Sequence, residues 1–266
     1  MSSAQYSFAP GFGAIADRLT IRRVEDIRPA AEALHEFALS VANLRTAPCA
    51  NIASKELMTD GEGAVLAAEV FGWVGPRPLW WKNTRIALTS PLVAACRYES
   101  EPFWCNQYGI YVREGNPYIE ALDLANFCKR AMTDTAAIVV PIHLPFSQIG
   151  AVSFVSLDPQ RIDLSAEFEQ YADLFGLYAR KFICGYVKVR NTQGLVRPDV
   201  RLSKREVECL RWAALGKTDE EIATIIHRSR ATIRFHVHNA AVKLDAVNRS
   251  QALFKASQLG YLGAVG

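Results

Sequence analysis

Apolar residues recur at helical spacing in two long stretches of the chain, 30–44 and 168–182. The apolar side chains stand three or four positions apart, at Ala30, Leu34, Phe37, Val41 and Leu44, then at Phe168, Tyr171, Phe175, Tyr178 and Phe182. This spacing predicts two amphipathic helices. Between them, residues 136–144 and 151–157 are β-branched runs separated by Pro, Ser and Gly, which predicts a β-hairpin within a sheet. Helices flanking short strands favour an α/β fold, an α/β/α sandwich with a mainly antiparallel sheet.

The C-terminal quarter of the chain shows repeated helix-capping patterns. Ser203, Thr218 and Asn248 each stand three positions before a Glu or Gln, ahead of an apolar-periodic run. That spacing is typical of a capping box, in which two side chains satisfy amides at the start of a helix. Ser229 can cap a further helix, and Gly260 can end the last one. These patterns predict an all-α helix-turn-helix domain with helices at 203–215, 218–226, 229–244 and 248–259.

The segment 188–201 separates the two regions. It is polar and contains Gly194 and Pro198, which favour a loop over regular structure. We therefore expect an N-terminal domain at 1–187, a linker at 188–201 and a C-terminal domain at 202–266.

The third C-terminal helix is expected to turn an aromatic ring toward solvent. At 100° per residue its apolar side comprises Ile233, Val237, Ala240 and Leu244. Arg234, Phe235 and His238 then point away from the domain core. A phenyl ring in that position is costly unless something covers it, and the bases of a DNA major groove would do so.

The neighbouring polar residues suit the same partner, double-stranded DNA. An arginine at position 234 can pair with guanine O6 and N7, and basic or hydroxyl groups at the start of the helix can hold phosphates. A solvated surface charge is the alternative for each residue taken alone. The candidate DNA-binding residues are Lys217, Ser229, Arg230, Thr232, Arg234, Phe235, His238 and Lys243.

The charge distribution agrees with a DNA-binding C-terminal domain. Residues 201–266 contain 11 Lys and Arg against 6 Asp and Glu, whereas residues 1–200 contain 19 against 21. A basic module attached to a slightly acidic body is expected if only the smaller domain meets a polyanion.

Several other classes of protein are disfavoured by the sequence. The six cysteines form no C-x-x-C pair, and His236 and His238 diverge on a helix, so we expect no metal site. The chain lacks a glycine-rich phosphate loop and paired carboxylates, and we expect neither enzymatic activity nor a cofactor. It also lacks a long apolar stretch and a signal-peptide pattern, and we expect a cytoplasmic protein that does not contact membranes.

Residues 202–262 strongly resemble the LuxR-type DNA-binding domain. The resemblance rests on Glu206, Gly216, Lys217, Thr232, His236, Val237, Lys243, Leu244 and Arg249. It implies an ion pair between Glu206 and Arg249, homodimers on two-fold related half-sites, and base reading by residues 234, 235 and 238. Asp245 stands where the family usually has glycine, which Asp can replace because it tolerates the left-handed conformation. RNA polymerase is a further candidate partner.

The N-terminal body is similar, more weakly, to the autoinducer-binding domain of quorum-sensing regulators, through Pro78 to Trp104 and the hairpin at 138–155. Pro91, Trp104 and Trp81 fall near family positions. Ser90 replaces the aspartate that accepts from the signal amide, and Arg77 replaces a tryptophan. The resemblance therefore implies a small-molecule signal, an acyl-homoserine lactone or an atypical analogue of one. The candidate ligand-binding residues are Trp73, Arg77, Trp81, Ser90, Trp104, Tyr108 and Ser153.

Two interpretations of the N-terminal body remain open. In the first, the chain is a ligand-responsive regulator of the quorum-sensing type, a solo member of the family, with an aromatic pocket for an apolar or aromatic signal. In the second, the tryptophans are core residues and the body is a ligand-independent dimerisation module with its seam along the helix at 165–187.

Overall fold

A computed structural model describes residues 12–54, 56–73, 90–126, 136–190 and 200–263. The chain divides into two compact units, one formed mainly within residues 1–192 and the other within 193–266. The predictions for Arg77 and Trp81 lie outside the described residues.

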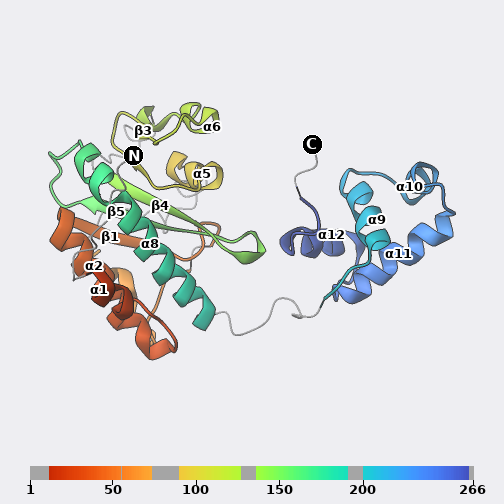
Figure 1. Ribbon diagram of the computed structural model, residues 1–266, viewed down its shortest axis with the longest axis horizontal. Helices are drawn as coiled ribbons and strands as arrows, with labels where there is room; N and C mark the ends of the chain where they lie inside the picture. Colours follow the sequence, from red (N-terminus) through yellow and green to blue (C-terminus); the bar gives the residue numbers. More distant parts are fainter. Residues whose placement is uncertain (1–11, 55, 74–89, 127–135, 191–199, 264–266) are drawn as a thin grey trace, which may run out of the picture. The chain divides into compact units, whose positions relative to one another are not determined.

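The N-terminal unit is built on a five-stranded antiparallel sheet in the order β1-β5-β4-β2-β3 (Figure 1). Its strands are β1 (Leu44–Cys49), β2 (Phe103–Cys105), β3 (Ile110–Tyr111), β4 (Ala137–His143) and β5 (Ile149–Ser156). The predicted hairpin is confirmed, since β4 and β5 pair with Ile138 opposite Phe154 and Val139 opposite Ser153.

Helices cover both faces of this sheet, so the predicted α/β/α sandwich is also confirmed. The helical segments are α1 (Phe12–Arg18), η1 (Val24–Asp26), α2 (Ile27–Ala42), α3 (Leu66–Glu69), α5 (Pro91–Tyr98), α6 (Pro117–Glu120), η3 (Pro145–Ser147) and α8 (Ser165–Arg190). Because side chains alternate along a strand, Ile138 and Phe154 pack with α2 and α8 in one core, the α2–α8 core. Val139 and Phe103 pack with α5 in the other, the α5 core.

The ends of the two long helices differ from the prediction. α2 ends where Asn43 adopts the left-handed conformation, with φ of 53°, and Leu44 begins strand β1 instead of continuing the helix. Asparagine tolerates this conformation better than most residues, which makes it a natural helix terminator. α8 continues to Arg190, three residues into the segment predicted to be the linker.

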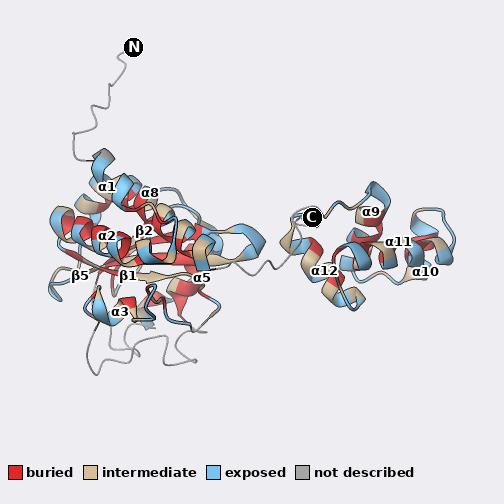
Figure 2. Cartoon of the chain, turned by 90° about the horizontal axis from the view of Figure 1, so that it is seen from below, coloured by how far each residue is buried: buried red, intermediate tan, exposed pale blue. Residues whose placement is uncertain are grey.

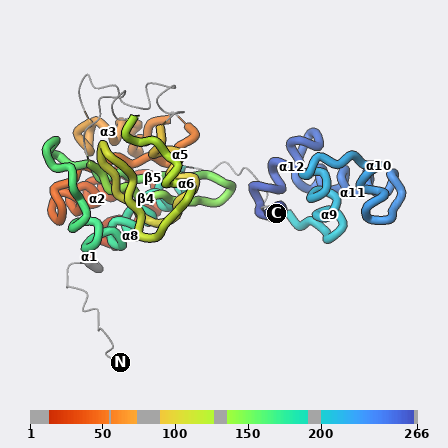
Figure 3. Tube along the Cα trace, turned by 90° about the horizontal axis from the view of Figure 1, so that it is seen from above, coloured from red at the N-terminus to blue at the C-terminus, as the bar shows by residue number. Residues whose placement is uncertain are grey.

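The C-terminal unit consists of α9 (Lys204–Ala214), α10 (Asp219–Ile225), α11 (Arg230–Lys243) and α12 (Arg249–Gln258). The four predicted helices are confirmed, and α10 and α11 lie side by side (Figure 3). Buried residues gather between the helices (Figure 2), with Cys209, Ile222 and Ile233 in one cluster and Leu210, Ala240 and Leu244 in another.

Capping residues explain where these helices begin. Ser203 and Thr218 form the predicted capping boxes, and Ser229 accepts a hydrogen bond from the Thr232 amide. The predicted box at Asn248 is half right. Its side chain accepts from the Gln251 amide, but the Gln251 side chain accepts from the Val247 amide instead of reaching back to Asn248.

Left-handed backbone occurs at four described positions in this unit, Gly216, His227, Asp245 and Gly260. Gly216 and Gly260 have φ of 81° and 77°, and Asp245 has φ of 50° at the position where glycine is usual in the family. The expectation that Asp245 takes this conformation is confirmed.

Candidate nucleic-acid interface

Helix α11 has the two-sided character expected from its sequence. Ile233 and Ala240 are fully buried, whereas Arg234 and His238 are exposed. The Phe235 ring is 60% exposed, and it lies in edge-to-face contact with His236, with ring centroids 5.7 Å apart. The surface of α11 therefore presents an arginine, an aromatic ring and an imidazole on the side away from the core.

The amino end of α11 is open to solvent. Ser229 Oγ accepts from the Thr232 amide at 3.1 Å and lies 2.8 Å from the Thr232 hydroxyl. Arg230 beside it is exposed. The first amides of a helix have no intrahelical acceptor, and together with the helix dipole they favour an anion at this end.

Lys217 occupies the joint between α9 and α10. Its ammonium lies 3.6 Å from Glu221, and its side chain is 42% exposed. Pairs of this kind on a surface are weak and exchange readily for another anion.

The expected pair between Glu206 and Arg249 is wrong. Lys243 donates to both carboxylate oxygens of Glu206 at 2.8 Å, and the Ser203 amide donates to Glu206 Oε2 at 2.7 Å. Arg249 instead donates to Asp219 and to the Lys217 carbonyl oxygen, the latter at 2.7 Å. The packing decides the pairing, because α11 and α9 are neighbours and the last turn of α11 brings Lys243 to the carboxylate.

This arrangement also corrects the role expected for Lys243. Its ammonium is engaged by a carboxylate that is only 5% exposed, so it is not a free phosphate ligand. Burial raises the pKa of Glu206, but the hydrogen bonds from Lys243 and the Ser203 amide outweigh burial and leave the pKa below its usual value of 4.5. The pair ties the end of the third helix to the start of the first.

Asp219 is a residue that the sequence analysis missed. It is the first residue of α10, and its carboxylate lies between Arg249, with Nη1 at 2.5 Å, and Arg234, with Nε at 3.8 Å. The sequence places an acid in the first turn of a predicted helix, but only the packing of three helices brings the two arginines to it.

The described candidate ligand-binding residues do not converge. Trp104 packs against the α2–α8 core and stacks on Tyr111 with ring centroids 4.1 Å apart. Trp104 pairs with Ile138 and Ser153 pairs with Val139, so the two side chains point to opposite faces of the sheet. Tyr108 is 65% exposed in the turn after β2.

Trp73 and Ser90 have local roles in the fold. The Trp73 indole N–H donates to the Thr46 carbonyl oxygen at 2.7 Å, and the Arg45 guanidinium lies 5.1 Å from the centre of its ring. Trp73 thereby covers strand β1 at the edge of the sheet, which agrees with the interpretation of this tryptophan as a core residue. Ser90 is buried at the start of α5 and makes no capping hydrogen bond to that helix.

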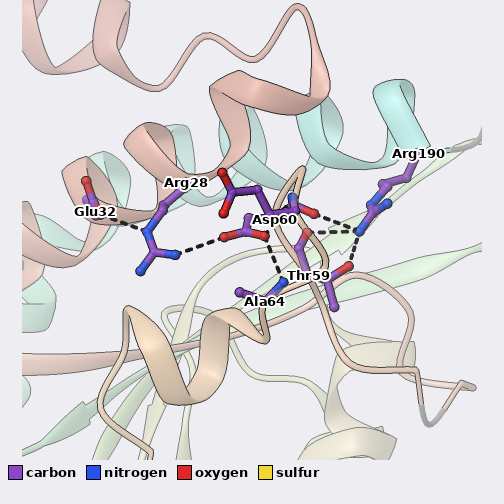
Figure 4. Close-up of polar contacts among 7 residues, drawn as sticks. Arg28, Glu32, Thr59, Asp60, Ala64 and Arg190 are labelled. Atoms are coloured by element: carbon purple, nitrogen blue, oxygen red, sulfur yellow. Dashed lines mark hydrogen bonds and ion pairs between the residues drawn. The ribbon is translucent and has the colours of Figure 1, made fainter.

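The sequence analysis also missed a polar cluster at the end of α8, the Asp60 cluster (Figure 4). The Asp60 carboxylate accepts from Arg28 at 3.0 Å and from the amides of Glu62 and Ala64. Arg190 donates to the carbonyl oxygens of Thr59 and Asp60 at 3.2 and 3.1 Å. The pattern Asp-Gly at 60–61 indicates an Asx-type turn, but its contact with the last turn of α8 depends on tertiary structure.

The described residues contain no group of His, Cys, Asp or Glu suited to a metal ion. Within the same part of the chain, no helix is long and apolar enough to cross a membrane.

Comparison with known proteins gives one family match and several similar regulators. Residues 200–256 match the family described as bacterial regulatory proteins, luxR family. The transcriptional activator protein VanR of Vibrio anguillarum is 37% identical over 127 residues, which are 48% of this chain and 52% of VanR. The quorum sensing-dependent transcriptional regulator RpaR of Rhodopseudomonas palustris is 36% identical over 127 residues, 46% of this chain and 47% of RpaR. The chain thus spans about half the length of the curated relatives it matches.

Among solved structures, a crystal structure of Escherichia coli SdiA is 24% identical. It covers 69% of this chain and 72% of SdiA with a TM-score of 0.38.

Proposed function

From the match of residues 200–256 to the luxR family of bacterial regulatory proteins, we propose that the chain is a transcriptional regulator that binds double-stranded promoter DNA through α11. The observation that supports this most directly is the exposed Phe235 ring between Arg234 and His238. An aromatic ring flanked by an arginine and an imidazole on one exposed helix face suits a DNA major groove, which offers thymine methyl groups and base edges.

Each exposed group then has a defined task. Arg234 donates to guanine O6 and N7, Phe235 contacts bases, and His238 reads the next position along the groove. Lys217, Arg230 and Thr232 hold phosphates, with the capped amino end of α11 at Ser229 adding its amides and its dipole.

The test is a binding measurement with the full chain at low salt. A randomised duplex library selects a preferred sequence, and affinity is then measured by fluorescence anisotropy on that duplex and on a random one. Arg234→Ala should lose about 1–3 kcal/mol on the preferred duplex and relax preference at one base pair. Arg230→Ala should weaken both duplexes alike.

The matched control is Lys204→Ala, which removes an exposed positive charge from α9 and should change both affinities only slightly. Equal losses for Arg234→Ala on preferred and random duplexes would refute base reading by that residue. Failure of the unmodified chain to select any sequence would refute the proposal as a whole.

For the N-terminal unit we propose a small-molecule signal of the quorum-sensing type, distinct from a standard acyl-homoserine lactone. Two features of the sequence support it: the resemblance of residues 78–104 to autoinducer-binding domains, and the uncharged Ser90 where those domains place an aspartate. A hydrogen bond to a charged group is worth about 1.5–3 kcal/mol, so its absence weakens a lactone by roughly tenfold to a hundredfold.

Titrating a panel of acyl-homoserine lactones against the unmodified chain and Ser90→Asp tests this proposal. We expect weak binding by the unmodified chain and a gain for Ser90→Asp. Tight binding by the unmodified chain would refute the atypical signal. Mass spectrometry of small molecules that co-purify with the chain identifies the natural one.

A homodimer is the assembly we propose, since two-fold related half-sites need two copies of α11. The second interpretation, in which the N-terminal unit only dimerises and binds no signal, places the seam along α8, where Leu177 is 55% exposed. Leu177→Asp should convert a dimer to a monomer in sedimentation equilibrium if α8 forms the seam. Retention of the dimer would exclude that seam.

A further inference from the structure

We propose that Asp219 is a positioning residue that aims Arg234 at its base and thereby sets base preference. This inference rests on the proposed DNA binding by α11 and deepens it. Asp219 lies on α10, outside the helix that enters the groove, and its contact with that helix is the ion pair with Arg234.

The carboxylate of Asp219 is itself held in place. Its side chain is 20% exposed, and Oδ1 accepts from Arg249 Nη1 at 2.5 Å. Arg249 is fixed in turn, because its Nη2 donates to the Lys217 carbonyl oxygen at 2.7 Å. An arginine whose planar guanidinium donates to two fixed acceptors has little freedom to rotate. The second oxygen, Oδ2, is therefore presented at a defined place beside α11.

The contact with Arg234 leaves the two outer nitrogens of its guanidinium free. Oδ2 lies 3.8 Å from Arg234 Nε, the nitrogen nearest the backbone, and the Arg234 side chain is 69% exposed. The guanidinium has five N–H donors in a planar fork. A carboxylate at Nε leaves the outer nitrogens available for guanine O6 and N7, which is the commonest specific contact in the major groove.

Restricting Arg234 favours a base contact over a phosphate contact. A free arginine loses rotamer entropy when it is fixed, and part of that loss has already occurred when Asp219 restrains the side chain. The carboxylate also repels nearby phosphates, which weakens binding to every duplex. The first effect raises the ratio of specific to random binding, whereas the second lowers both affinities alike and leaves the ratio unchanged.

A purely structural role for Asp219 predicts different behaviour. If the carboxylate served only to hold Arg249, its loss would loosen the joint of α10 and α12 and weaken all contacts, whether or not Arg234 is present. A double-mutant cycle separates the two roles, because coupling between Asp219 and Arg234 appears only if one acts through the other.

The experiment measures the ratio of affinities of the full chain for its library-selected duplex and for duplexes changed at the base pair read by Arg234. That base pair is identified as the one at which Arg234→Ala loses preference. Asp219→Asn keeps an oxygen for Arg249 and should lower the preference by about two- to tenfold, the lower part of the range of coupling within one charge network. It should also bind random duplex more tightly than the unmodified chain does.

In the Arg234→Ala background, Asp219→Asn should leave base preference unchanged. Glu220→Gln, the control, removes the same charge from an exposed neighbour on α10 and should raise random binding without altering preference. If Asp219→Asn does not fold, as judged by circular dichroism, Asp219→Glu keeps the charge and displaces the carboxylate, and preference should again fall.

Unchanged preference in both Asp219 variants would overturn the inference while leaving DNA binding intact. An equal effect of Asp219→Asn with and without Arg234 would also overturn it and assign Asp219 to the fold alone. An unmodified chain that selects no sequence would overturn the proposed function itself, and this inference with it.

Discussion

Replacing Lys243 with methionine should destabilise the C-terminal unit without abolishing a phosphate contact. Lys243 donates to both oxygens of Glu206 at 2.8 Å, and the Glu206 side chain is only 5% exposed. Methionine keeps the aliphatic stem but not the ammonium. The carboxylate would retain the Ser203 amide as a donor and lose its charged partner.

The size of the effect follows from the burial of the two groups. A hydrogen bond to a charged group contributes about 1.5–3 kcal/mol. The Lys243 side chain is 42% exposed, so water screens the ion pair. We therefore expect a loss at the lower end of that range, about 1.5 kcal/mol. For a domain of this size, roughly 4–8 °C of melting temperature accompany each kcal/mol, so the shift should be about 6–12 °C.

Hydrogen exchange of amides in α9 and α11 of the full chain measures this stability without DNA. Glu206→Gln should cost a similar amount, and the double variant should cost less than the sum because the two residues share one interaction. Lys204→Met, an exposed lysine at the start of α9, is the matched control and should leave exchange unchanged. Unaltered exchange in Lys243→Met together with equally weakened binding to all duplexes would refute this reasoning. It would show that Lys243 binds a DNA phosphate.

The same pair predicts a pH dependence. The pKa of Glu206 is lowered in the folded state, so its contribution to stability is present above the ordinary pKa of 4.5 and is lost as the pH falls through the lower folded value. The difference in unfolding free energy between the unmodified chain and Glu206→Gln should therefore shrink as the pH falls below 4.5. A constant difference would contradict ionisation of the pair.

Two further predictions concern exposed and buried groups elsewhere. Phe235→Ala should leave stability almost unchanged because the ring is 60% exposed, yet weaken binding to the selected duplex; a large loss of stability in thermal unfolding would show that the ring packs inside the unit. Asp60→Asn should lower the unfolding free energy of the N-terminal unit by about 1.5–3 kcal/mol and speed hydrogen exchange at the end of α8, as measured by mass spectrometry. Burial raises the pKa of Asp60, but hydrogen bonds from the Ala64 and Glu62 amides and from Arg28 leave it below 3.8, so this difference should shrink as the pH falls below 3.8. Equal protection of α8 in both proteins would exclude the Asp60 cluster as its anchor.

Local patterns in the sequence were sufficient for the elements and for the outward face of α11. Capping residues such as Ser203 and Thr218 fix where a helix starts through bonds within one turn, and the spacing of Ile233 and Val237 fixes which side of α11 is buried. The two β-branched runs and the Pro, Ser and Gly between them likewise predicted the hairpin of β4 and β5. These features depend on residues within a few positions of each other, which is why the sequence determines them.

Tertiary structure alone decided which partner each charged residue takes. The resemblance implied a pair between Glu206 and Arg249, but the neighbouring positions of α9 and α11 bring Lys243 to the carboxylate instead. In the same way, Asp219 meets two arginines from other helices, and Asp60 meets Arg28 from 32 residues away. An ion pair forms between whichever groups the packed backbone brings within reach, and that distance is a property of the whole fold, which no local pattern records.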